Sequence, residues 1–122
     1  MNLVKIVEKY HLVLLFVFGS FDTERFNNNS DIDVGYIAKK TLNNEEEVNL
    51  LTELVFFFKR DLIDLVNMNS ATPLLLFEAA NKAKVLYEKD DSFLRFKIKA
   101  FARYTETKFL RDMRRDFLEK SI

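Results

Sequence analysis

Two aspartates and a glycine-serine pair have the residue types and spacing for metal-dependent chemistry on phosphates. Gly19 and Ser20 are followed, after ten further residues, by Asp31 and Asp33. Residues i and i+2 of an extended strand point to the same side, so both carboxylates are expected on one face. When two carboxylates lie so close together, each disfavours the ionised form of the other, and a bound divalent cation offsets this repulsion. Such hard oxygen ligands favour magnesium or manganese over zinc.

A third carboxylate, Asp64, lies in the otherwise apolar segment 62–66. An unpaired charge within a buried strand is costly, so the pattern predicts a compensating group or cation beside Asp64. If this segment pairs with the strand that carries Asp31 and Asp33, three carboxylates surround one or two metal ions. Such a cluster suits phosphoryl or nucleotidyl transfer, in which metal ions neutralise the charge that develops on the phosphates.

The remaining residues of the motif suit a phosphate chain. Gly19 would let the backbone approach a triphosphate closely, and Ser20 with the following amides would hydrogen-bond the phosphate oxygens. A bare Asp-x-Asp also occurs in turns, at helix starts and in calcium loops. Counted from Asp31 as position one, a calcium loop needs glycine at position six and glutamate at position twelve, where this chain has Tyr36 and Leu42. A calcium loop is therefore excluded.

The chain must supply strands that bring these residues together. Apolar runs predict strands over residues 12–18, about 31–38, 61–68 and 84–88. Helical spacing predicts a helix over residues 2–10 and a long helix from residue 91 or 92 onward. Capping residues predict two more helices, one from the cap Asn43 to about residue 59 and one that Thr72 and Pro73 open and that continues to residue 83. Residues 21–30 are expected as a polar surface loop. This order predicts an α/β or α+β fold with about four strands, as a single domain over residues 1–122.

Composition excludes several other classes of function. The chain has no cysteine and one histidine, which excludes thiolate zinc sites and cysteine nucleophiles. The longest apolar run, residues 12–18, is too short to span a bilayer, and the first residues lack a signal-peptide pattern, so we expect no membrane association and a cytoplasmic location. Nineteen basic and nineteen acidic residues balance, although residues from 92 onward carry +5. Nucleic acid is therefore not expected as a direct substrate.

The motif resembles a known signature. Gly19-Ser20 and Asp31-x-Asp33, together with Ser30 before the first aspartate, are similar to the signature of nucleotidyltransferases of the DNA polymerase beta type. The small size and the stretch from residue 64 to 73 resemble the minimal nucleotidyltransferases (MNT) that accompany HEPN toxins. The resemblance covers nearly the whole chain and implies a mixed four-stranded sheet with helices packed on it.

The resemblance also implies an activity and a set of site residues. Members of that family act as antitoxins that transfer AMP from ATP to a tyrosine of a HEPN ribonuclease. Asp31 and Asp33 would hold two magnesium ions, and Asp64 would help to bind metal and activate the acceptor hydroxyl. The nucleotide would be bound by three small residues: Gly19, Ser20 and Ser30. Many relatives carry an arginine soon after the glycine-serine pair. Here the candidate is Arg25, and its spacing leaves open whether it takes that role.

A chain of 122 residues is expected to need a partner chain to complete the acceptor site. The long C-terminal helix carries apolar stripes wider than one core face, which predicts a contact surface for a HEPN-type toxin in a hetero-oligomer. The residues expected to form it are Phe93, Phe96, Tyr104, Phe109 and Phe117, although any single phenylalanine taken alone is expected to pack within the chain. Two alternatives stay open: an antitoxin that neutralises by binding alone, and a nucleotidyltransferase that modifies a small molecule with a second, helical subunit.

Overall fold

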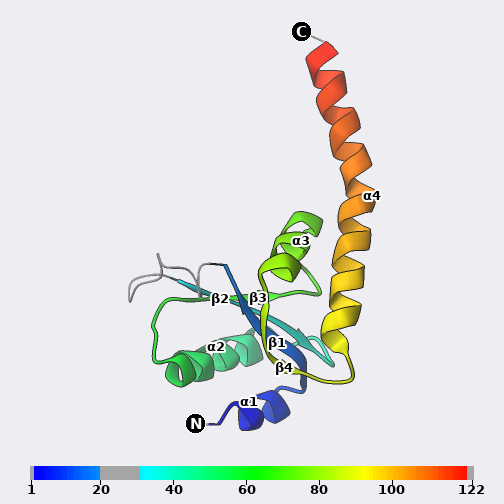
Figure 1. Ribbon diagram of the computed structural model, residues 1–122. Helices are drawn as coiled ribbons and strands as arrows, with labels where there is room; N and C mark the ends of the chain where they lie inside the picture. Colours follow the sequence, from blue (N-terminus) through cyan, green and yellow to red (C-terminus); the bar gives the residue numbers. More distant parts are fainter. Residues whose placement is uncertain (1, 20–30, 121–122) are drawn as a thin grey trace.

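The computed structural model describes residues 2–19 and 31–120, which form a four-stranded sheet with helices on both faces (Figure 1). The elements in chain order are α1 (Leu3–Lys9), β1 (Leu12–Phe18), β2 (Ile32–Ala38), α2 (Asn44–Phe58), β3 (Ile63–Asn67), α3 (Pro73–Lys82), β4 (Lys84–Glu88) and α4 (Ser92–Lys120). All eight elements predicted from the sequence are present in the predicted order. The third strand is shorter than the predicted range 61–68: it begins at Ile63 and ends at Asn67.

The sheet is mixed, with the strand order β3-β2-β1-β4. The central strand β1 pairs antiparallel with β2 and with β4, whereas β2 pairs parallel with β3. The starts of β2 and β3 therefore lie at the same end of the sheet as the end of β1. The described segments that carry Gly19, Asp33 and Asp64 meet at this end.

Two hydrophobic cores lie on opposite faces of the sheet, because successive strand side chains point to opposite sides. In β1, Leu15 and Val17 pack with α1 and α2, whereas Leu14 and Phe16 pack with α3 and the first part of α4. The molecule thus has three layers, with α1 and α2 on one side of the sheet and α3 and α4 on the other (Figure 1). This explains why residues 12–18 are apolar at every position.

Local capping chemistry fixes the helix starts. The Asn43 side chain accepts a hydrogen bond from the Glu46 amide at 2.8 Å, and the Glu46 carboxylate accepts one from the Asn43 amide at 3.0 Å. This capping box confirms the predicted start of α2. The Thr72 hydroxyl accepts a hydrogen bond from the Leu75 amide at the start of α3.

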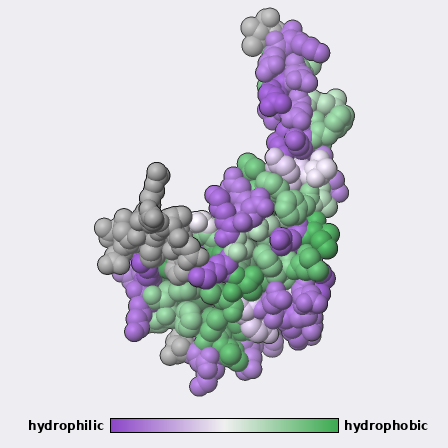
Figure 2. Space-filling view, viewed as in Figure 1, coloured by the Kyte–Doolittle hydropathy of each residue, from purple (hydrophilic) through white to green (hydrophobic). Residues whose placement is uncertain are grey.

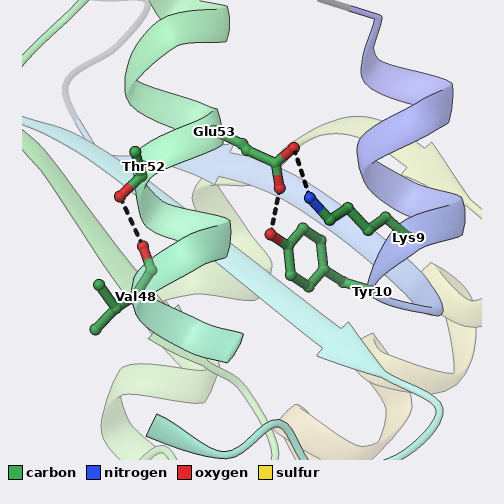
Figure 3. Close-up of polar contacts among 5 residues, drawn as sticks. All are labelled: Lys9, Tyr10, Val48, Thr52 and Glu53. Atoms are coloured by element: carbon green, nitrogen blue, oxygen red, sulfur yellow. Dashed lines mark hydrogen bonds and ion pairs between the residues drawn. The ribbon is translucent and has the colours of Figure 1, made fainter. Parts of the chain in front are cut away.

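Polar contacts join α1 to α2 on their shared face of the sheet (Figure 3). The Tyr10 hydroxyl donates a hydrogen bond to the Glu53 carboxylate, and Lys9 forms an ion pair with the same carboxylate at 3.4 Å. Burial, together with the hydrogen bond and the negative charge of Glu53, raises the pKa of Tyr10. Within α2, the Thr52 hydroxyl donates to the Val48 carbonyl at 2.9 Å.

The long helix α4 packs through its first part only and then projects from the body (Figure 1). Phe96 is buried against the sheet, and the Tyr104 ring stacks on Phe77 of α3 with centroids 4.0 Å apart. Beyond Tyr104, Phe109 and Phe117 are 67% and 70% exposed. The expectation that any single phenylalanine packs within the chain is therefore wrong for these two residues.

Two of the residues that were expected to contact a partner chain, Phe93 and Phe96, instead pack within this chain. Phe96 is buried in the core and is not available to another chain, whereas Phe93 packs against that core and is only partly buried. Apolar side chains nevertheless lie along the projecting part of the helix, in contact with solvent (Figure 2). They are Phe109, Leu110, Met113, Phe117 and Leu118. Within the described residues, neither α4 nor any other helix is long and apolar enough to cross a membrane.

Candidate functional site

Asp33 and Asp64 face each other across neighbouring strands. They are register partners in the parallel pairing of β2 with β3, which begins with the amide of Ile32 donating to the Leu62 carbonyl at 2.9 Å. Partners in register lie on the same face of a sheet. Both aspartates line one cavity of about 280 Å³ at this end of the sheet. The predicted pairing of the two strands is therefore present.

The surroundings of Asp33 favour its protonated form. Burial raises the pKa of Asp33, and the neighbouring charges of Asp64 and Asp31 raise it further, whereas the positive charge of Lys82 acts in the opposite direction. These causes are desolvation and repulsion between like charges. A site of this kind gains stability when positive charge comes close to the carboxylates.

Gly19 makes room for the Asp33 carboxylate. Gly19 directly follows β1 and has a φ of +88°, and a Cβ at this position would lie 2.5 Å from Asp33 Oδ2. Any larger residue would displace the carboxylate and would also need a backbone conformation that L-residues rarely adopt. The sequence analysis predicts that Gly19 lets the backbone approach a triphosphate closely. The structure adds that the missing side chain of Gly19 leaves room for the Asp33 carboxylate.

Asp64 is exposed, so the sequence argument that placed its charge within a buried strand is wrong. β3 is an edge strand of the sheet, and the Asp64 side chain opens onto the cavity rather than into a core. Its charge is therefore solvated as well as close to Asp33. Asp64 was predicted as the third carboxylate. It lies at the site because its strand pairs in register with β2, and not because a buried charge needs compensation.

The other predicted residues differ in how far the structure describes them. Asp31 directly precedes β2, is exposed and is close enough to Asp33 to raise its pKa, but it does not line the cavity. Ser20, Ser30 and Arg25 lie outside the described residues. Their predicted contacts with phosphate stay predictions.

The sequence patterns do not single out two further charged residues that line the cavity, Glu78 and Lys82. Together with Leu75 they occupy positions three and four residues apart on α3, which share one face of a helix. Helical spacing alone predicts this shared face. That the face borders Asp33 and Asp64 depends on the path of α3 across the sheet, which the spacing does not give.

A comparison with protein families matches residues 1–92 to the family described as "Polymerase beta, Nucleotidyltransferase". The chain belongs to this nucleotidyltransferase family. The match includes every strand and ends where α4 begins. Gly19, Asp33 and Asp64 therefore lie in the part of the chain that defines family membership.

Within this nucleotidyltransferase family, the chain is similar to the protein adenylyltransferase MntA of Shewanella oneidensis. The two are 32% identical over 95 residues, which cover 76% of this chain and 66% of MntA. A crystal structure described as a toxin-antitoxin with AMP-PNP is 26% identical, with a TM-score of 0.79 over 95% of this chain and 94% of that one. The tri-AMPylated HEPN toxin in complex with the MNT antitoxin of S. oneidensis provides a chain that is 25% identical, with a TM-score of 0.74 over 95% and 92% of the two chains.

The donor atoms at the nucleotidyltransferase site fit a magnesium ion in their chemistry. Asp33 and Asp64 offer carboxylate oxygens on neighbouring strands. The negative charges of Asp64 and Asp31 repel the Asp33 carboxylate, and a bound cation would relieve this repulsion. In residues 2–19 and 31–120, no group of three or more His, Cys, Asp or Glu side chains is arranged to hold a metal ion. The described site therefore presents a pair of carboxylates, with Asp31 nearby, rather than an assembled set of three.

Proposed function

We propose that this chain is a metal-dependent nucleotidyltransferase that acts as an antitoxin by transferring AMP from ATP to a tyrosine hydroxyl of a HEPN ribonuclease toxin. The observation that carries the proposal is the pairing of Asp33 with Asp64 in one cavity beside Gly19. Membership of the nucleotidyltransferase family supports the class of reaction. The relative that is a protein adenylyltransferase, and the relatives solved as toxin-antitoxin complexes, support the choice of acceptor.

In the proposed reaction the acceptor oxygen forms a bond to the α-phosphorus of ATP, while the bond from that phosphorus to the bridging oxygen of the β-phosphate breaks. Pyrophosphate leaves with the bonding electron pair. A tyrosine hydroxyl has a pKa near 10, so its proton must be removed as it attacks. We assign this proton to Asp64, which is exposed and lines the cavity.

Asp31, Asp33 and Asp64 are the proposed magnesium ligands, and two ions would satisfy the charge of the site. Magnesium, when bound, neutralises charge on the phosphates and orients the α-phosphorus for attack. The proposed nucleotide-binding residues are Gly19, Ser20 and Ser30. Gly19 supports this role with its position at the cavity wall beside Asp33.

We propose that the projecting part of α4 binds the toxin. A row of large apolar side chains is exposed there, of which Phe109, Met113 and Phe117 follow each other at intervals of four residues. This spacing forms a continuous stripe on a helix. Exposed apolar stripes of this kind mark contact surfaces between proteins. The stripe lies beyond the family match, which ends at residue 92.

The experiment that tests the proposal follows a label on the α-phosphate of ATP. The chain is incubated with labelled ATP, magnesium and its HEPN-type partner, and the proteins are then separated under denaturing conditions. We expect label on the toxin, no label when magnesium is removed by a chelator, and no label when the acceptor tyrosine is replaced by phenylalanine. A toxin that is neutralised and carries no label would instead support the alternative in which binding alone silences it.

A further inference from the structure

The last turn of α3 brings a lysine to the carboxylate cavity. α3 follows β3 and leads into β4, whose first residue, Lys84, is the register partner of Val17 near the end of β1. The connection from α3 to β4 therefore lies at the same end of the sheet as Gly19. Lys82, the last residue of α3, lines the cavity together with Asp33 and Asp64.

The cavity needs positive charge if a nucleotide is to enter it. Its described lining includes three acids, Asp33, Asp64 and Glu78. Among the described lining residues, Lys82 alone carries a positive charge. A triphosphate brought beside three carboxylates meets strong repulsion unless cations neutralise it. Magnesium at the aspartates would offset one part of the phosphate chain, and Lys82 offers positive charge for another part.

We propose that Lys82 binds the β- and γ-phosphates of the nucleoside triphosphate and stabilises the pyrophosphate as it leaves. This assignment rests on the proposed function, and it names the residue that holds the leaving group. The electron pair of the broken bond moves onto a pyrophosphate oxygen, and the positive charge of Lys82 would offset the negative charge that develops there. An ammonium on a long flexible stem suits this task, because it follows the phosphates as they separate.

A simpler role for Lys82 is that of a counter-charge for the acids. Its charge acts on Asp33, where it opposes the effects of burial and of Asp64. The two roles differ in what they predict for nucleotides of different length. A phosphate ligand favours ATP over AMP, because only ATP has β- and γ-phosphates. A counter-charge to Asp33 affects both nucleotides alike, because it acts through the carboxylates and the metal that they bind.

The test measures the affinity for ATP and for AMP by calorimetry with magnesium present, in wild type, Lys82→Met and Lys82→Arg. Lys40→Met is the matched control, because Lys40 is an exposed lysine that follows β2 at the opposite end of the sheet. We expect Lys82→Met to weaken ATP binding about tenfold or more and to leave AMP binding unchanged, as loss of one charge-assisted contact implies. Lys82→Arg is expected to retain most of the ATP affinity, and Lys40→Met all of it.

The outcomes separate this assignment from the proposed function. An equal loss for ATP and AMP in Lys82→Met would overturn the phosphate contact in favour of the counter-charge, and an unchanged ATP affinity would overturn it outright. If wild type itself binds no ATP, the proposed nucleotidyl transfer fails first. Thermal unfolding of each variant checks that the fold is intact, and Lys82→Gln is a second neutral variant for the same comparison should Lys82→Met prove unstable.

Discussion

At the scale of single residues, the contact between Gly19 and Asp33 is the tightest constraint on the site. A Cβ at Gly19 would lie 2.5 Å from Asp33 Oδ2, on a backbone with φ of +88°. We expect Gly19→Ala to reduce the free energy of unfolding by about 1–2 kcal/mol through backbone strain alone. We also expect it to abolish ATP binding, because the displaced carboxylate no longer faces Asp64. Urea unfolding and calorimetry measure the two effects.

The double variant Gly19→Ala with Asp33→Ala is the matched control for this prediction. Removing the Asp33 carboxylate also removes the steric clash, so the second substitution should cost less stability in the Gly19→Ala background than in wild type. The strain of the positive φ stays in both Gly19→Ala chains. A Gly19→Ala variant with wild-type stability and wild-type ATP affinity would show that the glycine does not position the acid.

The residues of the site could be predicted from the sequence only where strand geometry decides their place. Asp33 and Asp64 were within reach of prediction, because a parallel pairing of their two strands puts them in register. Glu78 and Lys82 were not, because their position depends on how α3 crosses the sheet. The exposure of Asp64 depends on which strand forms the edge, and an apolar sequence does not reveal that.

At the scale of elements, a partly buried hydrogen bond joins α2 to the sheet. Tyr36 of β2 is 1% exposed, and its hydroxyl donates to the Glu47 carboxylate of α2 at 2.7 Å. Burial and the Glu47 charge raise the pKa of Tyr36. In the unfolded chain a tyrosine loses its proton near pH 10, whereas folded Tyr36 keeps its proton at that pH. Stability from this contact is therefore complete below about pH 10 and declines as the pH rises further.

We expect Tyr36→Phe to lower the free energy of unfolding by about 1–3 kcal/mol at pH 8, because the hydrogen bond is made to a charged group. Urea unfolding between pH 8 and pH 11 should then show a shallower decline above about pH 10 in Tyr36→Phe than in wild type. Tyr10 also has a raised pKa, so some decline is expected to persist in the variant. Parallel curves for the two proteins would contradict this account of Tyr36.

Most elements could be predicted because local chemistry specifies them. The cap Asn43 with Glu46 starts α2 through its own hydrogen bonds, and Thr72 with Pro73 starts α3 in the same local way. The strand β1 is recognisable because both of its faces are buried, so that it lacks alternation. The limits of β3 were less accurate, since a short edge strand is bounded by pairing with its neighbour rather than by its own residues.

At the scale of the whole molecule, we propose separate roles for the body, which carries the carboxylate cavity, and for the projecting part of α4, which binds the toxin. We expect Phe109→Ser with Phe117→Ser to leave the free energy of unfolding nearly unchanged, because both side chains are already exposed. The same double variant is expected to lose the toxin, which co-elution in size-exclusion chromatography measures. Leu94→Ser with Ile98→Ser is the matched control, since these side chains are similarly exposed, at 59% and 61%, on the part of α4 that packs on the body.

Retention of the toxin by the Phe109 and Phe117 variant, or its loss in the Leu94 and Ile98 control, would move the contact surface elsewhere. The sequence predicts an excess of apolar residues on α4 but not which of them are exposed. Phe96 and Phe109 are the same residue type on one helix, and only the place where α4 leaves the body separates them. Near that place, Tyr104 of α4 stacks on Phe77 of α3.

The most direct test of the central claim is transfer of α-phosphate label to the toxin by wild type and by Asp33→Asn, side by side. Asp91→Asn is the control, because it makes the same change of charge in the turn before α4, where asparagine tolerates the positive φ of 57°. We predict that Asp33→Asn binds the toxin as wild type does and transfers label at least about a hundredfold more slowly. Transfer by Asp33→Asn at the wild-type rate would contradict the account.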